Sequence, residues 1–524
     1  MYRQCLVAVI GLAAQVGIAN SSASIVPAQS VHGSIHDNIH EQALPSTIKA
    51  KMVEAGLSDE ELSLWIEPLD ANIAKTPTQT ITRQAPLVRH RADKLRTPAS
   101  TQKLITTLIA LHTLGENHHW LTRVYPKGMV LNGVLYGDLV IKGSGDPSMT
   151  HDRLTAMLEQ VQKQGIRHIH GDIIIDNSAF SNVKYDINAF DGQGIRAYNA
   201  APNAFLVNFG TVEVDVLPSG HDALVQMGDE KVITFIPTDE QTAAVRVLPP
   251  LDDFDAPTQI SANHTSCLND GKFHLTNDKL TILNGTRATC GRQSYWLTFD
   301  DADTLAVKAV GGVWRSLDAK FTGRVRMAAD ASSPAIAWLS YPSRPLSEQI
   351  YLINQYSNNV MTEQVALSLP LSMPMAKQGA VSDYPRAFNF INKWWQTHLT
   401  TQPPIMSRAS GLCRDCAITT SAMAELLVFA YHQPNFEVFR ESLPIAGQTG
   451  TMTSLSERDA DHPAIGRAYV KTGTLNNVKS LAGYVMDTQG RWYAMVAIIN
   501  APDAGHDSRA TAVLDETLSY VATR

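Results

Sequence analysis

The spacing Ser-x-x-Lys occurs three times in the sequence, at Ser46–Lys49, Ser100–Lys103 and Ser181–Lys184. On a helix this spacing brings the two side chains together within one turn. A serine hydroxyl becomes a nucleophile when a neighbouring base removes its proton, and a lysine is such a base where burial lowers its pKa. About one match is expected by chance in a chain of this length, so the sequence around each pair must show which pair is suited to catalysis.

Only the Ser100–Lys103 pair opens a nearly uncharged segment, LITTLIALHTL. This pattern predicts a helix that is buried in the middle of its domain, where Lys103 loses its hydration. The Ser181 pair lies in the polar stretch NSAFSNVKYD, and the Ser46 pair lies on a lysine-containing, solvated helix. Context therefore selects Ser100 as the candidate nucleophile and Lys103 as its candidate base. On this pair alone, an ordinary helix start with a solvated lysine would be the better interpretation.

A second group is Lys471-Thr472-Gly473 in the segment AYVKTGTL. A given tripeptide of this kind is expected by chance in fewer than about one chain in ten of this length. The segment predicts a strand, on which Lys471 and Gly473 face one side and Thr472 the other. Gly473 leaves space for a substrate backbone, and the N–H of Thr474 is then the second donor to an oxyanion, opposite the N–H of Ser100.

A third group is Ser357-Asn358-Asn359. The pattern Ser-x-Asn occurs twice, and the second copy, Ser261–Asn263, lies close to Cys267 in a region of short strands. Ser357 instead falls between two helical patterns and precedes the Lys-Thr-Gly strand. Ser-x-x-Lys, Ser-x-Asn and Lys-Thr-Gly in this chain order are the signature of penicillin-binding proteins and class A β-lactamases.

Several elements must position these residues. Helical periodicity covers residues 48–64, 346–369 and 384–399, and a terminal helix begins near residue 507. SLAGYVMD and RWYAMVAIIN predict a hairpin with Thr-Gln-Gly between its strands. Between about residues 120 and 327, short β-like runs surround one helical pattern. We predict an α+β fold in which helices flank an antiparallel sheet and a large, mostly β insertion interrupts the domain.

The predicted organisation has a signal peptide and three domains. Arg3 and the apolar run after it predict a secretory signal over residues 1–23, and hence export, most simply to the periplasm. No later segment is long and apolar enough for a membrane span. The domain ranges are 24–118 with 341–524 for the catalytic domain, 119–206 with 300–340 for the insertion, and 207–299 for a subdomain nested in it.

The cysteines remaining after the signal are even in number, which in an oxidising compartment predicts disulfides. They are Cys267, Cys290, Cys413 and Cys416; Cys5 leaves with the signal. Pairing of near neighbours is the simplest of three connectivities. Cys413 and Cys416 also have the spacing of a redox or zinc motif, but their polar surroundings contain no second ligand pair, so we favour a structural disulfide.

The histidine and charge patterns suggest no metal, cofactor or nucleic-acid partner. His32, His36 and His40 would share one helix face, a spacing that metal sites use, but they lie in a polar N-terminal stretch for which a solvated tail is the better interpretation. A net charge of −7 gives no reason to expect nucleic-acid binding. The sequence leaves homodimer formation open.

On these motifs the sequence resembles the class C low-molecular-mass penicillin-binding proteins, which are D-alanyl-D-alanine carboxypeptidases and endopeptidases. PASTQK, YSNN and VKTGT match the three active-site motifs of that family, and GDLVIKGSGDPSMT, GDIIIDNSAF and LPIAGQTGTM resemble its landmarks between the motifs. The long gap between Ser100 and Ser357 is also similar, since the family fills it with two extra domains. The resemblance implies the same penicillin-recognising fold.

The resemblance also implies roles. Ser100 would attack the carbonyl of the penultimate D-alanine of a peptidoglycan stem peptide to form an acyl-enzyme, with Lys103 as base. Ser357 and Asn359 would relay protons and hold the substrate amide. The terminal carboxylate would be bound by Lys471 and Thr472, and β-lactam antibiotics would inhibit by acylating the nucleophile.

This chain departs from the family pattern at two places, and two other functions are alternatives. Arg408-Ala-Ser-Gly-Leu-Cys413 replaces Asp-Gly-Ser-Gly-Leu-Ser, and Asn358 occupies a position where Asp is frequent. Tyr356-Ser-Asn358 also fits the Tyr-x-Asn motif of a β-lactamase or esterase, in which Tyr356 assists the base. A catalytically silent envelope protein that binds peptidoglycan is the second alternative, and the intact lysines argue against it.

Overall fold

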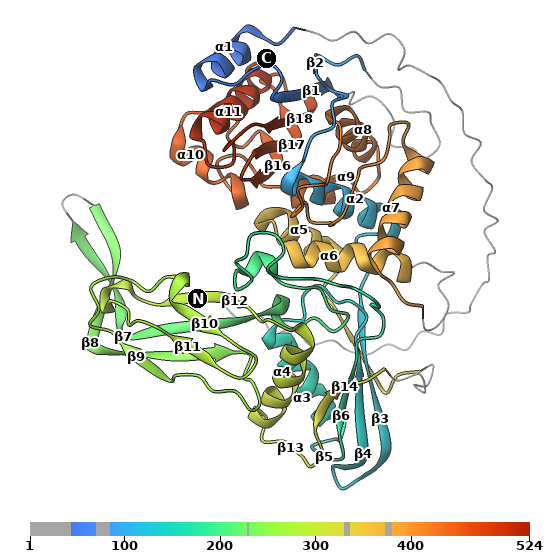
Figure 1. The fold of residues 1–524 in the computed structure, drawn as a ribbon, viewed down its shortest axis with the longest axis vertical. Helices are drawn as coiled ribbons and strands as arrows, with labels where there is room; N and C mark the ends of the chain where they lie inside the picture. The colour runs from blue at the N-terminus through green and yellow to red at the C-terminus, as the bar shows by residue number, and fades with distance from the viewer. Residues whose placement is uncertain (1–42, 70–83, 228–229, 330–335, 373–379) are drawn as a thin grey trace, which may run out of the picture. The chain divides into compact units, whose positions relative to one another are not determined.

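The computed structural model describes residues 43–69, 84–227, 230–329, 336–372 and 380–524 (Figure 1). The predicted signal peptide, Cys5, His32, His36 and His40 lie outside these residues. Within them, no helix is long and apolar enough to cross a membrane.

A five-stranded antiparallel sheet is the centre of the part that carries the three motifs. Its strand order is β16-β17-β18-β1-β2. The strands are β16 (Ala468–Leu475), β17 (Val478–Met486), β18 (Trp492–Asn500), β1 (Leu62–Pro68) and β2 (Val88–His90). The predicted hairpin is confirmed as β17 and β18, and the sheet joins the C-terminal strands to two strands from the beginning of the chain.

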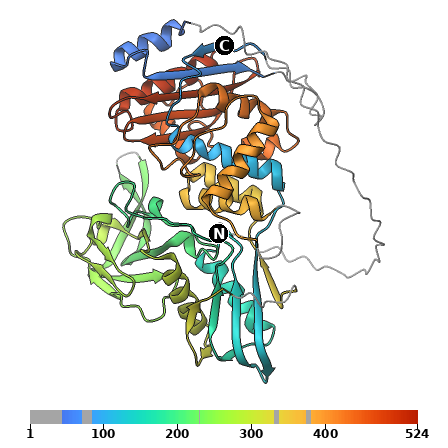
Figure 2. The same cartoon turned by 45° about the vertical axis from the view of Figure 1, so that its right-hand side comes forward.

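Helices cover both faces of this sheet (Figures 1 and 2). Met495, Ala497 and Ile499 of β18 pack in one core with α1 (Ser46–Ala55) and α11 (Ser508–Ala522). The alternate residues Val496 and Ile498 pack in a second core with α2 (Lys103–Leu114) and α8 (Thr420–Tyr431). Because side chains of a strand alternate between faces, burial of both faces makes β18 a continuous apolar run.

Helix α2 lies inside the helical layer on the second face. The residues from Lys103 to Leu111 are all buried, and α2 contacts its neighbours α5, α6, α7 and α8. The further helices of this layer are α5 (Leu346–Tyr356), α6 (Asn359–Ser368), α7 (Tyr384–His398) and α9 (Phe436–Ser442). The prediction that the helix after Ser100 is buried in the middle of its domain is confirmed.

The helix predicted over residues 48–64 is wrong in its second half. Helix α1 ends at Ala55, because Gly56 adopts a left-handed conformation with φ +70° and its N–H closes the last turn. The segment from Leu62 onward is strand β1, between β18 and β2. Its apolar residues are buried on both faces, so the period-2 alternation that identifies a half-exposed strand is lost.

The region between the first two motifs forms sheets of its own. A seven-stranded sheet contains β3 (Leu121–Leu131), β4 (Val134–Lys142), β5 (His168–His170), β6 (Ile173–Asp176), β13 (Lys320–Phe321), β14 (Val325–Met327) and β15 (Leu339–Pro342). Helices α3 (His151–Lys163) and α4 (Ala302–Ser316) share its core. The strands β5 and β6 thus pair with β13 and β14, and β3 pairs with β15, so strands from the beginning of the region join strands from its end.

The segment between β6 and α4 forms two further sheets with a separate core. A four-stranded sheet has the order β12-β7-β8-β9, and β10 pairs with β11. These strands are β7 (Thr211–Met227), β8 (Glu230–Leu248), β9 (Gln259–Ser261), β10 (Phe273–Leu275), β11 (Leu280–Ile282) and β12 (Gln293–Thr298). The long hairpin of β7 and β8 extends beyond the other strands (Figure 1).

A loop of this region contacts helix α6 directly. The side-chain amide of Gln364 accepts a hydrogen bond from the backbone N–H of Asn203 at 3.0 Å and donates one to its carbonyl at 2.8 Å. The side chain of Asn359, at the start of α6, donates to the carbonyl oxygen of Tyr198 at 2.9 Å. Because α6 follows directly after Ser357, these bonds connect the inserted region to the second motif.

Candidate active site

Ser100 and Lys103 lie at the junction of a short 3₁₀ turn, residues Ala99–Gln102, with helix α2. The Nζ atom of Lys103 lies 2.9 Å from the Oγ atom of Ser100. Ala99, the residue before Ser100, has φ +51°, a conformation that is costly for a residue with a Cβ. The structure therefore confirms the contact that the spacing predicts and shows that a strained backbone precedes it.

The electrostatic environment favours the neutral form of Lys103. The side chain is fully buried, and this burial holds the pKa of its ammonium group well below the ordinary value of 10.5. The nearby charge of Lys471 lowers this pKa further, whereas the carboxylate of Glu363 opposes the shift. A neutral amine beside a serine hydroxyl can accept its proton, so the pair is suited to nucleophilic catalysis.

A loop from residue 407 to residue 416 provides the second partner of Lys103. The carbonyl oxygen of Ser410 accepts a hydrogen bond from Nζ at 2.7 Å. The carboxylate of Glu363, on α6, accepts hydrogen bonds from the N–H groups of Ala409 at 3.0 Å and Ser410 at 2.9 Å. The motifs did not identify Glu363, although a single acidic residue in the neutral helix α6 is a signal for it.

Lys471 is the second buried lysine of the site. Its Nζ donates to the Oγ of Ser357 at 3.0 Å and to the carbonyl oxygen of Thr472 at 2.9 Å. Burial lowers its pKa to about 7. Ser357 lies in the turn between α5 and α6 with φ +57°, and the side chain of Asn358 caps α6 by accepting from the N–H of Met361 at 3.0 Å. Asp and Asn cap equally well, which explains Asn at this position.

Strand β16 lies directly against the turn that carries the nucleophile. A Cβ atom added to Gly473 would approach the backbone nitrogen of Ser100 to 3.0 Å and the carbonyl oxygen of Pro98 to 2.8 Å. Thr472 points to a different neighbour, since its Oγ1 donates to the Oγ1 of Thr451 at 2.8 Å. Thr474 is exposed beside Gly473. Glycine is therefore required for this approach of two backbones.

The structure brings together Ser100, Lys103, Ser357 and Lys471. The amide of Asn359 instead contacts the inserted region, as described above. Tyr356, which would assist the base in the Tyr-x-Asn interpretation, is 67% exposed, whereas Lys103 and Lys471 are fully buried.

The other copies of the motifs lie elsewhere. Ser46 begins the surface helix α1, and its partner Lys49 is exposed. Ser181 lies in a loop with Lys184 exposed. Ser261 ends strand β9 and bonds the side chain of Asn263. Context thus separated the motif copies correctly.

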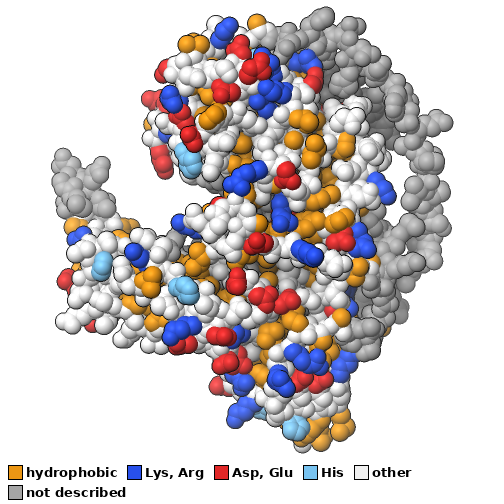
Figure 3. Space-filling view, in the orientation of Figure 1, with side chains coloured by type: hydrophobic (Ala, Val, Ile, Leu, Met, Phe, Trp, Pro, Cys, Tyr) orange, Lys and Arg blue, Asp and Glu red, His pale blue; other side chains and the backbone are white. Residues whose placement is uncertain are grey.

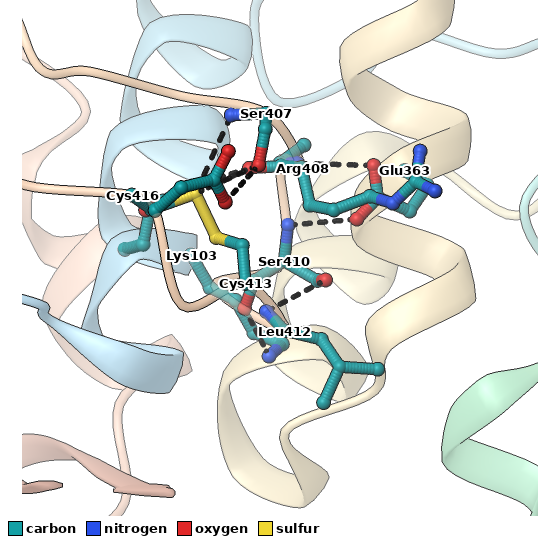
Figure 4. Close-up of a disulfide and its surroundings, with 11 residues drawn as sticks. Lys103, Glu363, Ser407, Arg408, Ser410, Leu412, Cys413 and Cys416 are labelled. Carbon is teal, nitrogen blue, oxygen red and sulfur yellow. Dashed lines mark hydrogen bonds between the residues drawn. A yellow bond between two sulfur atoms is a disulfide. The ribbon is translucent and has the colours of Figure 1, made fainter. Parts of the chain in front are cut away.

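The cysteines lie in two pairs at disulfide distance. The sulfur atoms are 1.93 Å apart for Cys267 and Cys290, and 1.90 Å apart for Cys413 and Cys416. Figure 4 shows the second pair in the loop that contacts Lys103. The pair and Asp415 also form a candidate metal-binding group, but sulfurs joined in a disulfide are not the thiolates that bind zinc.

Arg408 lies between two aromatic rings. Its guanidinium carbon is 4.4 Å from the ring centroid of Tyr185, in the inserted region, and 5.1 Å from that of Tyr384. These cation–π contacts fix the position of the charge that this chain has in place of the usual Asp. On the face drawn in Figure 3, basic and acidic side chains are interspersed.

Comparison with known proteins identifies a family. A model of the D-Ala-D-Ala carboxypeptidase 3 (S13) family matches residues 67–520, which include all three motifs. D-alanyl-D-alanine carboxypeptidase DacB of Haemophilus influenzae is 24% identical over 412 residues, covering 78% of this chain and 81% of its own. D-alanyl-D-alanine carboxypeptidase of Actinomadura sp. strain R39 is 23% identical over 434 residues, covering 80% of this chain and 76% of its own.

Solved structures support the same fold. Penicillin binding protein 4 (dacB) from Haemophilus influenzae has a TM-score of 0.67 at 19% identity and covers 90% of this chain and 98% of its own. A second structure of that protein, complexed with a novel β-lactam, has a TM-score of 0.64 at 18% identity with the same coverage. The predicted α+β class, with an antiparallel sheet between helices and a large insertion, is confirmed.

The close contact of Gly411 with Ala99 leads to a prediction. Gly411 has φ +80°, and an added Cβ would lie 1.9 Å from the carbonyl oxygen of Ala99. We expect Gly411→Ala to displace the turn of Ser100 and to slow its acylation by a fluorescent penicillin more than tenfold, on the order of the effect of a 1 Å misplacement. Stopped-flow fluorescence measures the rate.

Gly490→Ala is the matched control. Gly490 has nearly the same φ, +78°, but no atom lies within 4 Å of its added Cβ. This variant introduces the same backbone strain without the clash, so it should keep the acylation rate of the native protein. Equal rates in the two variants would contradict a positioning effect of Gly411.

Proposed function

The chain belongs to the D-Ala-D-Ala carboxypeptidase 3 (S13) family and is a serine-type D-Ala-D-Ala carboxypeptidase, and on this premise we propose that Ser100 is its nucleophile. The observation that carries this proposal is the 2.9 Å contact between the Oγ of Ser100 and the fully buried Nζ of Lys103. A serine needs a base, and burial lowers the pKa of Lys103 well below its ordinary value, which favours the neutral amine that can act as one.

Acylation follows from this geometry. Neutral Lys103 accepts the hydroxyl proton as the Oγ of Ser100 bonds to the carbonyl carbon of the penultimate D-alanine. The negative charge on the carbonyl oxygen is stabilised by the N–H groups of Ser100 and Thr474. The C–N bond then breaks, the proton passes to the nitrogen of the leaving D-alanine, and Ser357 assists this transfer. Water hydrolyses the resulting ester by the reverse proton path and releases the shortened stem peptide.

The terminal carboxylate is proposed to bind beside Lys471. This ammonium group donates one hydrogen bond to the hydroxyl of Ser357 and one to the carbonyl oxygen of Thr472. The hydroxyls of Thr472 and Thr451, 2.8 Å apart, are further donors next to it. A substrate carboxylate would stabilise the charged form of Lys471 against the burial that disfavours it. Asn359 is proposed to hold the substrate amide through its side-chain oxygen or its second N–H, because the bond to the carbonyl of Tyr198 uses only one N–H.

Binding of β-lactams is proposed for the same site. A β-lactam presents a strained amide and a carboxylate in the arrangement of the D-Ala-D-Ala end, so it would acylate Ser100. The β-lactam complex of the structurally similar Haemophilus influenzae protein supports this proposal. Peptidoglycan stem peptides are the proposed natural partners.

D,D-endopeptidase activity is a second proposed activity of the site. Cleavage of a peptide cross-link forms the same D-alanyl ester on Ser100. Only the leaving group differs, since it is the side-chain amine of a neighbouring stem peptide and not free D-alanine. The chemistry therefore requires no additional catalytic group.

The domain ranges and the location of the protein are also proposals. Pairing of β1 and β2 with β16, β17 and β18 supports one catalytic domain made of residues 24–118 and 341–524. The sheet that unites β3–β6 with β13–β15 supports an insertion of 119–206 and 300–340, with 207–299 nested in it. The signal sequence 1–23 and the two cysteine pairs at disulfide distance support export to the periplasm.

Labelling tests the nucleophile. We expect the protein to form a stable adduct with a fluorescent penicillin and to release D-alanine from a D-Ala-D-Ala pentapeptide. Ser100→Ala should abolish both, whereas Ser46→Ala and Ser181→Ala, at the other Ser-x-x-Lys pairs, should retain both. Gel fluorescence and a D-alanine assay measure the two outcomes. Rapid drug turnover without D-alanine release would indicate a β-lactamase, and neither reaction would indicate a binding protein.

The two buried lysines predict a bell-shaped dependence of kcat/KM on pH. Activity should fall on the acid side, because Lys103 regains its proton as pH falls through its depressed pKa. It should also fall as pH rises through about 7, because Lys471 then loses the charge that binds the carboxylate. Arginine stays charged, so Lys471→Arg should remove the alkaline limb. An unchanged alkaline limb in this variant would assign that limb to another group.

Digestion of purified cross-linked muropeptide dimers tests the endopeptidase proposal. We expect mass spectrometry to detect monomers from the native protein together with loss of terminal D-alanine, because one acyl-enzyme serves both reactions. Ser100→Ala should stop both in parallel. Release of D-alanine from dimers that stay intact would restrict the protein to carboxypeptidase activity.

A further inference from the structure

The loop that contacts the catalytic lysine is closed by a disulfide. The loop joins α7 to α8, and its base is a pair of backbone hydrogen bonds between Ile405 and Ala417, of 2.8 and 3.0 Å. Inside it, Cys413 and Cys416 are 5% and 1% exposed and lie at disulfide distance. Figure 4 shows this pair next to the backbone that receives the bond of Lys103.

The disulfide also ties the end of the loop to its beginning. The N–H of Ser407 lies 3.4 Å from the sulfur of Cys416, and the hydroxyl of Ser407 donates to the carboxylate of Asp415 at 2.6 Å. In the same loop, the N–H of Leu412 donates to the hydroxyl of Ser410 at 3.3 Å. The ring closed by Cys413 and Cys416 therefore restrains the part of the loop that follows Ser410.

Three positions of the loop contact the turn of the nucleophile. The carbonyl oxygen of Arg408 accepts from the side chain of Gln102. The carbonyl oxygen of Ser410 accepts from Lys103 at 2.7 Å. Gly411 packs so closely on Ala99 that no Cβ fits between them. The loop thus contacts residues on both sides of Ser100.

The bond to Ser410 orients the base. A neutral lysine amine has two N–H groups and one lone pair, and only the lone pair can accept a proton. When one N–H is directed to the Ser410 carbonyl, the lone pair can face the Oγ of Ser100, 2.9 Å away. A lysine side chain released from such a bond regains several rotatable torsions, so the productive orientation becomes less populated.

Glu363 fixes only one side of the loop. Its carboxylate holds the N–H groups of Ala409 and Ser410 from the direction of α6. The peptide unit that carries the Ser410 carbonyl continues into Gly411, which is in close contact with Ala99 but has no side chain to anchor it. After Gly411, the disulfide ring that follows Leu412 adds a further constraint on this side of the peptide unit.

We propose that the disulfide of Cys413 and Cys416 is a positioning element for catalysis, which holds the Ser410 carbonyl in place to orient the amine of Lys103 towards Ser100. The proposal rests on the proposed function, since it assumes that Lys103 is the base. It assigns to the two cysteines a role in the acylation step in addition to local stability.

A second role for the same disulfide predicts a different result. Cys413 lies at the edge of a cleft of about 320 Å³ that is also lined by Tyr185, Phe190, Arg408 and Arg414. A disulfide that only shaped this cleft would change the substrate concentration needed for half-saturation. A disulfide that orients Lys103 changes the maximal rate of acylation.

The chain provides a matched control for the experiment. Cys413→Ser/Cys416→Ser removes the disulfide at the site, and Cys267→Ser/Cys290→Ser removes the one in the four-stranded sheet region. For the full chain and both variants, stopped-flow acylation by a fluorescent penicillin gives the maximal rate constant, the half-saturating concentration and the final fraction of labelled molecules. Thermal unfolding is recorded in parallel.

We expect the maximal rate constant of the Cys413/Cys416 variant to fall about tenfold or more. Its half-saturating concentration should stay within about twofold, and its molecules should still label completely. The Cys267/Cys290 variant should acylate at the native rate. If the Cys413/Cys416 variant does not fold, the folded Cys267/Cys290 variant is treated with a dithiol. The dithiol becomes a cyclic disulfide as Cys413 and Cys416 gain two electrons and two protons. When alkylation of a sample shows that both thiols are free, the same fall of the maximal rate constant is expected.

Three outcomes would overturn the proposal. The first is an unchanged maximal rate constant in the variant without the Cys413–Cys416 disulfide. The second is a change in the half-saturating concentration alone. The third is an equal fall of the maximal rate constant in both variants that parallels their loss of thermal stability. Failure of the proposed function is distinguishable from these outcomes, because the native protein would then not be labelled at Ser100.

Discussion

The burial of two lysine side chains in one small volume is the constraint on which the rest of the site depends. Lys103 and Lys471 are both fully buried. An unpaired buried charge costs several kcal/mol, and such a group responds by a lowered pKa. Each amine has a hydroxyl and a carbonyl oxygen as partners, Ser100 and Ser410 for one, Ser357 and Thr472 for the other. Burial lowers the pKa of both amines, and the charge of Lys471 lowers that of Lys103 further. This asymmetry supports the proposed roles, in which Lys103 is the base and Lys471 binds the substrate carboxylate.

The fold produces this arrangement by bringing three segments of the chain together. The 3₁₀ turn at the start of α2, the turn between α5 and α6, and the strand β16 come from distant parts of the sequence and converge beside the five-stranded sheet. Two of these segments have unusual backbones, with positive φ at Ala99 and Ser357. A third, at Gly473, depends on the absence of a side chain. Strain is thus concentrated where the reactive groups meet, and the buried helices around them hold it in place.

The inserted region and the loop of the disulfide act on this centre from outside. The carbonyl of Tyr198 receives the Asn359 side chain, and the Tyr185 ring contacts the guanidinium of Arg408. On the other side, the loop closed by Cys413 and Cys416 carries the carbonyl partner of Lys103. Residues far from the motifs therefore hold the side chains of Asn359, Arg408 and Lys103 in position.

The sequence by itself determined the motifs, the buried helix after Ser100, the hairpin and the α+β class, because apolar periodicity and residue type are local signals. It failed at residues 62–68, where burial on both faces removed the alternation of a strand. Only the tertiary structure decided that Glu363, the Ser410 carbonyl, the Tyr198 carbonyl and the Gly411 contact belong to the site. The two carbonyl oxygens are backbone atoms, which every residue type possesses, and the Gly411 contact exists only because the loop packs on Ala99. The lone acidic residue of α6 is a signal for Glu363, but its partners are two backbone N–H groups distant in sequence. Such partners are set by how the chain packs, so the motifs alone do not identify them.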